Sequence, residues 1–96
     1  MLALDRHTLA VMETMGDRIR VLREAHALSC EALAEKIGVT RALVWQWEKD
    51  MVKGIRPENF IRLCHVLGVA PEYLIWGPGR EPSADPSQKP VKSSKR

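Results

Sequence analysis

The sequence predicts an all-α fold, a compact domain of five short helices within residues 14–77. Apolar residues recur there at intervals of three and four residues, the period of an amphipathic helix. Neither the alternating pattern of a half-buried strand nor an Asn-Gly hairpin turn occurs in this range. Ser, Thr or Pro stands at the start of most periodic segments and Gly follows several of them, as is usual at helix ends.

The first helix is predicted at about residues 14–26, and the second follows Ser29. The apolar face of the first helix is spaced by four, three and four residues along Met15, Ile19, Leu22 and His26. Ser29 is a favoured N-cap, and Gly38 suits the left-handed position just after a helix. The inward face of the second helix consists of Leu33, Ala34 and Ile37.

The third helix is predicted at residues 40–49, the fourth from Pro57 and the fifth from Pro71. Thr40 is suited to cap the third helix, and Pro is compatible with the first turn of the other two. The inner face of the third helix carries Val44 and Trp47. The buried stripe of the fourth helix, which Gly68 ends, is Phe60, Leu63, Cys64 and Leu67. The fifth helix runs through Tyr73, Leu74 and Trp76 to Gly77.

Two segments lie outside this body. Residues 1–13 are predicted to be an N-terminal extension, in which Asp5 is suited to cap a short helix beginning at Arg6. Residues 78–96 are rich in Pro, Ser and Lys and have Val91 as their only large apolar residue, which predicts a disordered tail or linker. The formal net charge of +3 belongs to this tail, because basic and acidic residues balance in residues 1–76.

Several classes of protein are disfavoured. No stretch reaches the about 18 to 20 consecutive apolar residues of a membrane span. The N-terminus lacks the pattern of a cleaved secretion signal, so we expect a cytoplasmic protein. Cys30 and Cys64 are far apart and the three His residues show no ligand spacing, which argues against a metal site or a disulfide framework. Because no signature of a nucleophilic catalytic site is present, we expect neither an enzyme nor a cofactor.

The second and third helices carry the sharpest functional signal. They are joined through Gly38, Val39 and Thr40, and so short a turn forces the helices to cross steeply. A steep crossing needs a small residue at the contact, which Ala34 supplies, and apolar residues around it. This is the helix-turn-helix arrangement, at about residues 30–48, in which the second helix of the pair lies in the major groove of DNA.

With this arrangement the sequence resembles the lambda-repressor-like family, which includes Cro- and CI-type phage repressors and XRE-like bacterial regulators. The matching residues are Gly16-Asp17-Arg18-Ile19-Arg20, Leu33-Ala34-Glu35-Lys36-Ile37-Gly38-Val39-Thr40, Trp47-Glu48-Lys49, Arg56-Pro57-Glu58-Asn59 and Pro71-Glu72-Tyr73-Leu74. They extend over the whole predicted body. The resemblance implies a five-helix domain that binds double-stranded DNA, as a homodimer on a palindromic operator.

Carried over residue by residue, the resemblance assigns base reading to the outer face of the third helix, at Arg41, Ala42, Trp45 and Gln46. The chemistry agrees, because Arg suits guanine, Gln suits adenine and Ala suits a thymine methyl group. Phosphate contacts are assigned to the start of the second helix, to the start of the third and to the loop that follows it, at Cys30, Thr40, Lys49, Lys53 and Arg56.

Two positions depart from the family pattern. The family commonly has Gln where this chain has Cys30, so the phosphate contact there is expected to be weakened or lost. At position 45 the family often has a small or polar residue, whereas Trp45 is bulky and is expected to face outward. Trp45 can stack on a sugar or cover a thymine methyl group, contact a protein, or lie along its own helix and pack on the N-terminal extension.

Two further sets of residues follow from the resemblance. Arg23 and Glu48 are expected to form an ion pair that orients the third helix. The dimer interface is assigned to the last helix, at Leu74, Ile75 and Trp76, although Tyr73 and Leu74 can equally be core residues.

The sequence therefore predicts a sequence-specific transcriptional regulator, most simply a repressor. The alternative is a protein-interaction module on the same fold, such as an antitoxin, an anti-repressor or an adaptor, with a protein bound at Trp45 or at the fifth helix. A third hypothesis makes the chain the N-terminal part of a longer repressor, with the tail as its linker.

Overall fold

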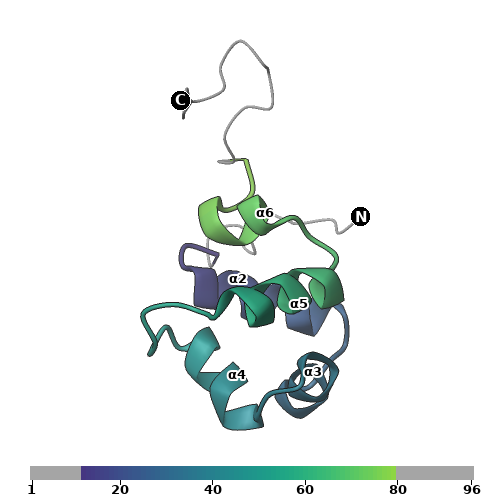
Figure 1. The fold of residues 1–96 in the computed structure, drawn as a ribbon. Helices are drawn as coiled ribbons and strands as arrows, with labels where there is room; N and C mark the ends of the chain where they lie inside the picture. Colours follow the sequence, from purple (N-terminus) through teal and green to yellow (C-terminus); the bar gives the residue numbers. More distant parts are fainter. Residues whose placement is uncertain (1–11, 80–96) are drawn as a thin grey trace, which may run out of the picture.

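A computed structural model describes residues 12–79, which form five helices and no strand (Figure 1). The helices are α2 (Met15–Ala25), α3 (Cys30–Ile37), α4 (Arg41–Glu48), α5 (Pro57–Leu67) and α6 (Pro71–Trp76). The all-α fold class is thereby confirmed. The predicted helix at Asp5 and Arg6 and most of the predicted tail lie outside the described residues.

The helix ends follow the capping chemistry of the sequence. Ser29 Oγ accepts a hydrogen bond from the backbone N–H of Ala32 at 3.0 Å. Thr40 Oγ1 accepts one from the N–H of Leu43 at 3.1 Å. Gly38 is left-handed, with φ 92° and ψ 32°, a conformation that strains any residue with a Cβ atom. The chain therefore leaves α3 and enters α4 with only two residues between Gly38 and the new helix.

The core lies among all five helices. α4 packs on α3 and α2, α5 packs on α3 and α2, and α6 lies against α2 and α5. Figure 1 shows α3 and α4 at one end of the domain and α6 at the other, with α2 and α5 between them. The buried core residues are Ile19, Leu22, Leu33, Ala34, Ile37, Val44, Trp47, Leu63, Cys64, Leu67 and Leu74.

His26 differs from the sequence prediction, which placed it on the inner face of the first helix. α2 ends at Ala25, and Ala27 takes a left-handed conformation with φ 57°. The chain turns away before a further helical position can form, so His26 is exposed. Its ring Nε2 lies 2.8 Å from the carbonyl oxygen of Leu67, which ties the end of α2 to the end of α5.

Within residues 12–79 no helix is long and apolar enough to cross a membrane. The same part of the chain contains no cluster of His, Cys, Asp and Glu side chains suited to a metal ion.

Candidate nucleic-acid interface

α3 and α4 form the predicted helix-turn-helix. Ala34 is buried where the two helices meet. The inner face of α4 packs in the core through Val44 and Trp47, which have 0% and 3% of their surface exposed. Because one face of this eight-residue helix is fixed by burial, the opposite face is held toward solvent in a single orientation.

The outer face of α4 presents the predicted base-reading residues together. Arg41, Ala42 and Trp45 are exposed and Gln46 is half-buried. In the described part of the chain the side chains of Arg41 and Gln46 form no intramolecular hydrogen bond or ion pair. Their donors and acceptors therefore remain available to an external partner without the loss of an existing contact.

Trp45 faces outward, as its position predicts, with 46% of its surface exposed. The ammonium group of Lys49, one turn later on the chain, lies 5.9 Å from the centre of its ring. This distance lies just within the range of about 6 Å over which a cation and an aromatic ring attract each other. The part of the prediction that places Trp45 on the N-terminal extension lies outside the described residues.

A pocket of about 330 Å³ opens beside this ring. Its lining includes Cys30 at the start of α3 and three residues of the outer face of α4, namely Arg41, Ala42 and Trp45. The predicted base-reading face is thus hollowed between the two helices of the motif.

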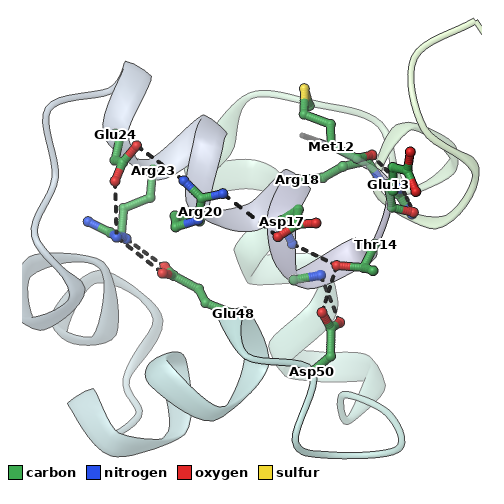
Figure 2. Close-up of polar contacts among 11 residues, drawn as sticks. Met12, Glu13, Thr14, Asp17, Arg18, Arg20, Arg23, Glu24, Glu48 and Asp50 are labelled. Atoms are coloured by element: carbon green, nitrogen blue, oxygen red, sulfur yellow. Dashed lines mark hydrogen bonds and ion pairs between the residues drawn. The ribbon is translucent and has the colours of Figure 1, made fainter. Parts of the chain in front are cut away.

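The last turn of α4 is fixed by the predicted pair of Arg23 and Glu48 (Figure 2). Arg23 Nε donates to Glu48 Oε2 at 2.5 Å and Nη2 donates to Oε1 at 3.1 Å. Arg23 Nη1 also donates to the carbonyl oxygen of Leu28 at 2.8 Å, in the loop before α3. Hydrogen bonding to Glu48 is the largest cause of a raised Arg23 pKa. One guanidinium therefore links α2, the loop before α3 and α4.

Cys30 faces this pair as well as the pocket. Its Sγ lies 3.9 Å from Glu48 Oε2. Desolvation by burial, followed by the nearby charge of Glu48, raises the pKa of the thiol above its usual value of 9.0. A neutral thiol is a weak hydrogen-bond donor, so a phosphate contact at this position depends on the backbone N–H of the first turn of α3 more than on the side chain.

A second anchor of α4 was not identified from the sequence. Asp50, in a left-handed conformation just after α4, accepts from the N–H of Gly16 at 3.0 Å and from Thr14 Oγ1 at 2.6 Å (Figure 2). A Cβ atom at Gly16 would lie 2.5 Å from the carbonyl oxygen of Glu48. The absence of a side chain at this position lets the first turn of α2 approach the end of α4. A glycine in the first turn of a helix, two residues after the N-cap threonine, was the signal available in the sequence.

The loop between α4 and α5 carries the three predicted phosphate-contacting cations, Lys49, Lys53 and Arg56, and all are exposed. Arg56 Nη1 lies 3.8 Å from Glu58 Oε2 in an exposed pair, which contributes little to stability and leaves the guanidinium accessible. With Arg41, these residues give the segment from α4 to α5 a surplus of positive charge, as expected of a surface that faces a polyanion.

The residues assigned to a dimer interface do not share one environment. Ile75 and Trp76 expose 49% and 50% of their surface, whereas Leu74 is fully buried. Leu74 therefore packs in the core, which is the second of the two roles that the sequence left open for it, and it offers no surface to a partner. α6 has one turn and a half, and its periodicity alone did not distinguish its inner face.

Arg18 holds α6 in place, a role that the sequence did not reveal. Its guanidinium is buried and donates to the carbonyl oxygens of Leu74 at 2.8 Å and Ile75 at 3.1 Å. It also donates to Met12 at 3.0 Å and to Glu13 at 3.2 Å (Figure 2). These bonds satisfy carbonyl groups at the end of α6 and tie the chain before α2 to the backbone of Leu74 and Ile75.

Comparison with known proteins supports the motif. A family model described as Helix-turn-helix matches residues 19–74. The chain is 32% identical over 65 residues to the Repressor protein C2 of Salmonella phage P22, a match that covers 68% of this chain and 30% of that protein. The chain thus corresponds to less than a third of the length of this relative.

Two solved structures of similar fold contain DNA. The crystal structure of the P22 c2 repressor in complex with synthetic operator 9T has a TM-score of 0.64 at 32% identity, and the match covers 68% of this chain and 97% of that one. The crystal structure of SinR, a master regulator of biofilm formation, in complex with DNA has a TM-score of 0.60 at 26% identity. That match covers 64% of this chain and 97% of the SinR chain.

Proposed function

This chain belongs to the lambda-repressor-like helix-turn-helix family, and we propose that it is a sequence-specific DNA-binding repressor of transcription. The observation that carries the proposal is the outer face of α4. Arg41 and Gln46 stand there without intramolecular partners in the described residues, while the inner face is fixed in the core. The similar P22 c2 and SinR structures are both complexes with DNA, which supports the same partner for this chain.

In the proposed complex α4 lies in the major groove. The Arg41 guanidinium is suited to guanine O6 and N7, and the Gln46 amide to adenine N6 and N7. Ala42 and Trp45 supply apolar contacts to base edges. Thr40 and the first turns of α3 and α4 face phosphates, as do the three cations of the following loop.

We further propose that two copies bind together through Ile75 and Trp76. Ile75 and Trp76 are half-exposed apolar side chains on α6, and such a pair fits a small two-fold contact. In the proposed dimer the two α4 helices enter successive major grooves about 34 Å apart and read a palindrome. Repression follows if the bound dimer excludes polymerase from a promoter. The proposal needs no chemical step or cofactor and places the protein on the nucleoid, in the cytoplasm.

Selection of binding sites from random duplex DNA tests this function. We expect enrichment of a palindromic site whose half-sites are about one helical turn apart. Sedimentation of the free protein and of the complex would give the stoichiometry. Failure to enrich any sequence would contradict the proposal and favour the protein-interaction module. A single enriched half-site bound by one copy would contradict only the dimer.

A further inference from the structure

We propose that Arg18 is a positioning residue for the contact between two copies of this chain, and that it thereby sets the spacing at which the pair binds two half-sites. The inference rests on the proposed DNA binding and on the proposed pairing through Ile75 and Trp76. It adds the buried side chain that orients these two residues.

Arg18 joins segments from the two ends of the described chain. Only 6% of its surface is exposed. Nε and Nη2 donate to the carbonyl oxygens of Leu74 at 2.8 Å and Ile75 at 3.1 Å. Nη1 donates to the carbonyl oxygens of Met12 at 3.0 Å and Glu13 at 3.2 Å. Because the guanidinium is planar and its N–H groups form a rigid fork, these bonds fix the end of α6 relative to the chain that enters α2.

The bonds from Arg18 matter because α6 is short. The helix has six residues and no side-chain cap at its start, and so short a helix is not stable alone in water. Leu74 is fully buried, and Tyr73 packs against the same core. This apolar burial holds α6 on the core, but the hydrophobic effect is not directional. Hydrogen bonds to two successive carbonyl groups add the direction, so the way in which Ile75 and Trp76 face depends on Arg18.

The chain just after α6 also fits the guanidinium closely. Gly77 is buried, with φ 95° and ψ 161°, in a region of positive φ that glycine adopts readily and other residues rarely adopt. A Cβ atom at this position would lie 3.3 Å from Arg18 Nη1, which is closer than an ordinary contact. The absence of a side chain therefore lets the chain pass close to Arg18 directly after Trp76. The backbone at Gly77 and the donors of Arg18 thus hold the same end of α6.

α2 also carries the anchor of α4, so it links the two proposed surfaces. Arg23, five residues after Arg18, pairs with Glu48 at the end of α4, whereas Arg18 bonds to the end of α6. α2 packs on both α4 and α6 and lies between them in Figure 1. In the proposed dimer, the placement of Ile75 and Trp76 relative to α4 determines how far apart the two α4 helices stand, and this separation must match grooves about 34 Å apart. A rotation of α6 therefore changes the preferred spacing and leaves the base-reading face as it is.

DNA probes that differ in spacing test the proposal. The selected palindrome is lengthened or shortened by one or two base pairs between its half-sites, and a further duplex carries a single half-site. Mobility-shift titrations give the affinity for the single half-site and the cooperative gain on each palindrome. The unmodified protein should prefer one spacing.

Arg18→Met removes the donors and keeps a long side chain. It should bind the single half-site within about twofold of the unmodified protein but lose about tenfold of the cooperative gain, the order expected for one hydrogen bond from a charged group. Its preference for one spacing should flatten. Gly77→Ala keeps the arginine but crowds it, so it should show the same pattern, and it decides the point if Arg18→Met does not fold.

Two further variants give the reference values. Trp76→Ala removes part of the proposed contact itself, so the cooperative gain should fall at every spacing. Arg20→Met is the matched control, because it removes an arginine that pairs with Asp17 and Glu24 on the surface of the same helix. It should change neither the affinity for the single half-site nor the preferred spacing. Circular dichroism verifies the fold of each variant.

The outcomes separate the levels of the proposal. If no sequence is enriched, the DNA-binding function fails, and if one copy binds a single half-site, the pairing fails; in both cases the role of Arg18 fails as well. If the unmodified protein pairs on DNA and folded Arg18→Met keeps its cooperative gain and its preferred spacing, only the role of Arg18 is wrong. That role is also wrong if Arg18→Met weakens binding to the single half-site as much as to the palindrome, because such a loss would show a general loss of structure.

Discussion

Removal of Arg23 is expected to cost this domain about 3–5 kcal/mol, because it leaves the Glu48 carboxylate buried without its cation. The Glu48 side chain is only 5% exposed and accepts hydrogen bonds from Arg23 at both oxygens. The remaining contact, from the Cys30 thiol at 3.9 Å, is too long and too weak to replace them. Proteins are stable by about 5–15 kcal/mol, and small domains lie toward the low end, so the loss is a large part of the total.

Urea unfolding of four variants would measure this cost. Arg23→Met removes the cation, Glu48→Gln removes the carboxylate charge, and the double variant removes both. We expect Arg23→Met to be the least stable, and the double variant to recover part of the loss because no buried charge is left unpaired. The matched control is Arg20→Met, whose cation pairs with Asp17 and Glu24 at 3.7 Å on the surface of the same helix. An exposed pair of this kind is worth about 0–1 kcal/mol.

A cost of leaving Glu48 buried without its cation is refuted if Arg23→Met unfolds at the same urea concentration as Arg20→Met. It is also refuted if the double variant is less stable than Arg23→Met. The sign of the pH effect adds a constraint. Hydrogen bonding to Glu48 raises the Arg23 pKa above its usual value, so the stabilisation is fully present below the unfolded-state pKa and is lost only as the pH rises through the folded-state pKa. Deprotonation of Arg23 therefore accounts for none of any stability change around neutral pH.

Four other substitutions or conditions have defined outcomes. Arg41→Ala should weaken binding to the selected operator by about 1–3 kcal/mol in a mobility-shift titration and relax the preference at one base pair; an unchanged preference would remove Arg41 from the base-reading set. Lys53→Ala should weaken binding to all sequences evenly and reduce the slope of log affinity against log salt by about 1, whereas a base-specific loss would argue against a phosphate contact. Gly16→Ala should lower the free energy of unfolding by about 1–3 kcal/mol, measured by thermal unfolding, because the new Cβ atom would lie 2.5 and 2.6 Å from carbonyl oxygens at the end of α4. A gain in stability would show that α2 and α4 can move apart at no cost. Burial raises the pKa of Cys30 and of Cys64, so the stability that these thiols contribute is present below the usual value of 9.0 and is lost as the pH rises through their folded-state pKa values. As the pH rises through this range, the midpoint temperature of thermal unfolding should fall more steeply for the unmodified protein than for a variant with Ala at both positions. Parallel plots of midpoint temperature against pH would contradict the burial argument.

The helices of this fold could be predicted because their ends are determined locally. Ser29 and Thr40 each bond to a backbone N–H three residues later, and Gly38 takes a conformation that glycine adopts at little cost. The end of α2 was less certain because the left-handed residue there is Ala27, which composition does not mark as a helix stop. The apolar period therefore continued one step too far, to His26.

The contacts of Arg18 could not be predicted in this way. An arginine on a short helix is usually solvated, and nothing in its neighbours indicates burial. Its long-range partners include the carbonyl oxygens of Leu74 and Ile75, which follow it by 56 and 57 residues. They are backbone atoms, so no pattern of residue types identifies them. Long-range bonds between a side chain and the backbone require the packed structure.

In the proposed complex, the contacts that hold α4 in place are made by other side chains than those that would read bases. α4 has eight residues and is too short to be stable alone in water, so its tertiary contacts hold it in place. Those contacts engage its inner face and its last turn, through the core, Arg23 and Asp50. Arg41 and Gln46 take no part in them within the described residues, so substitutions at these two positions should alter base preference with little loss of stability. Cys30 is different because it borders the pocket and also contacts Glu48. A substitution at Cys30 should therefore change recognition and stability together.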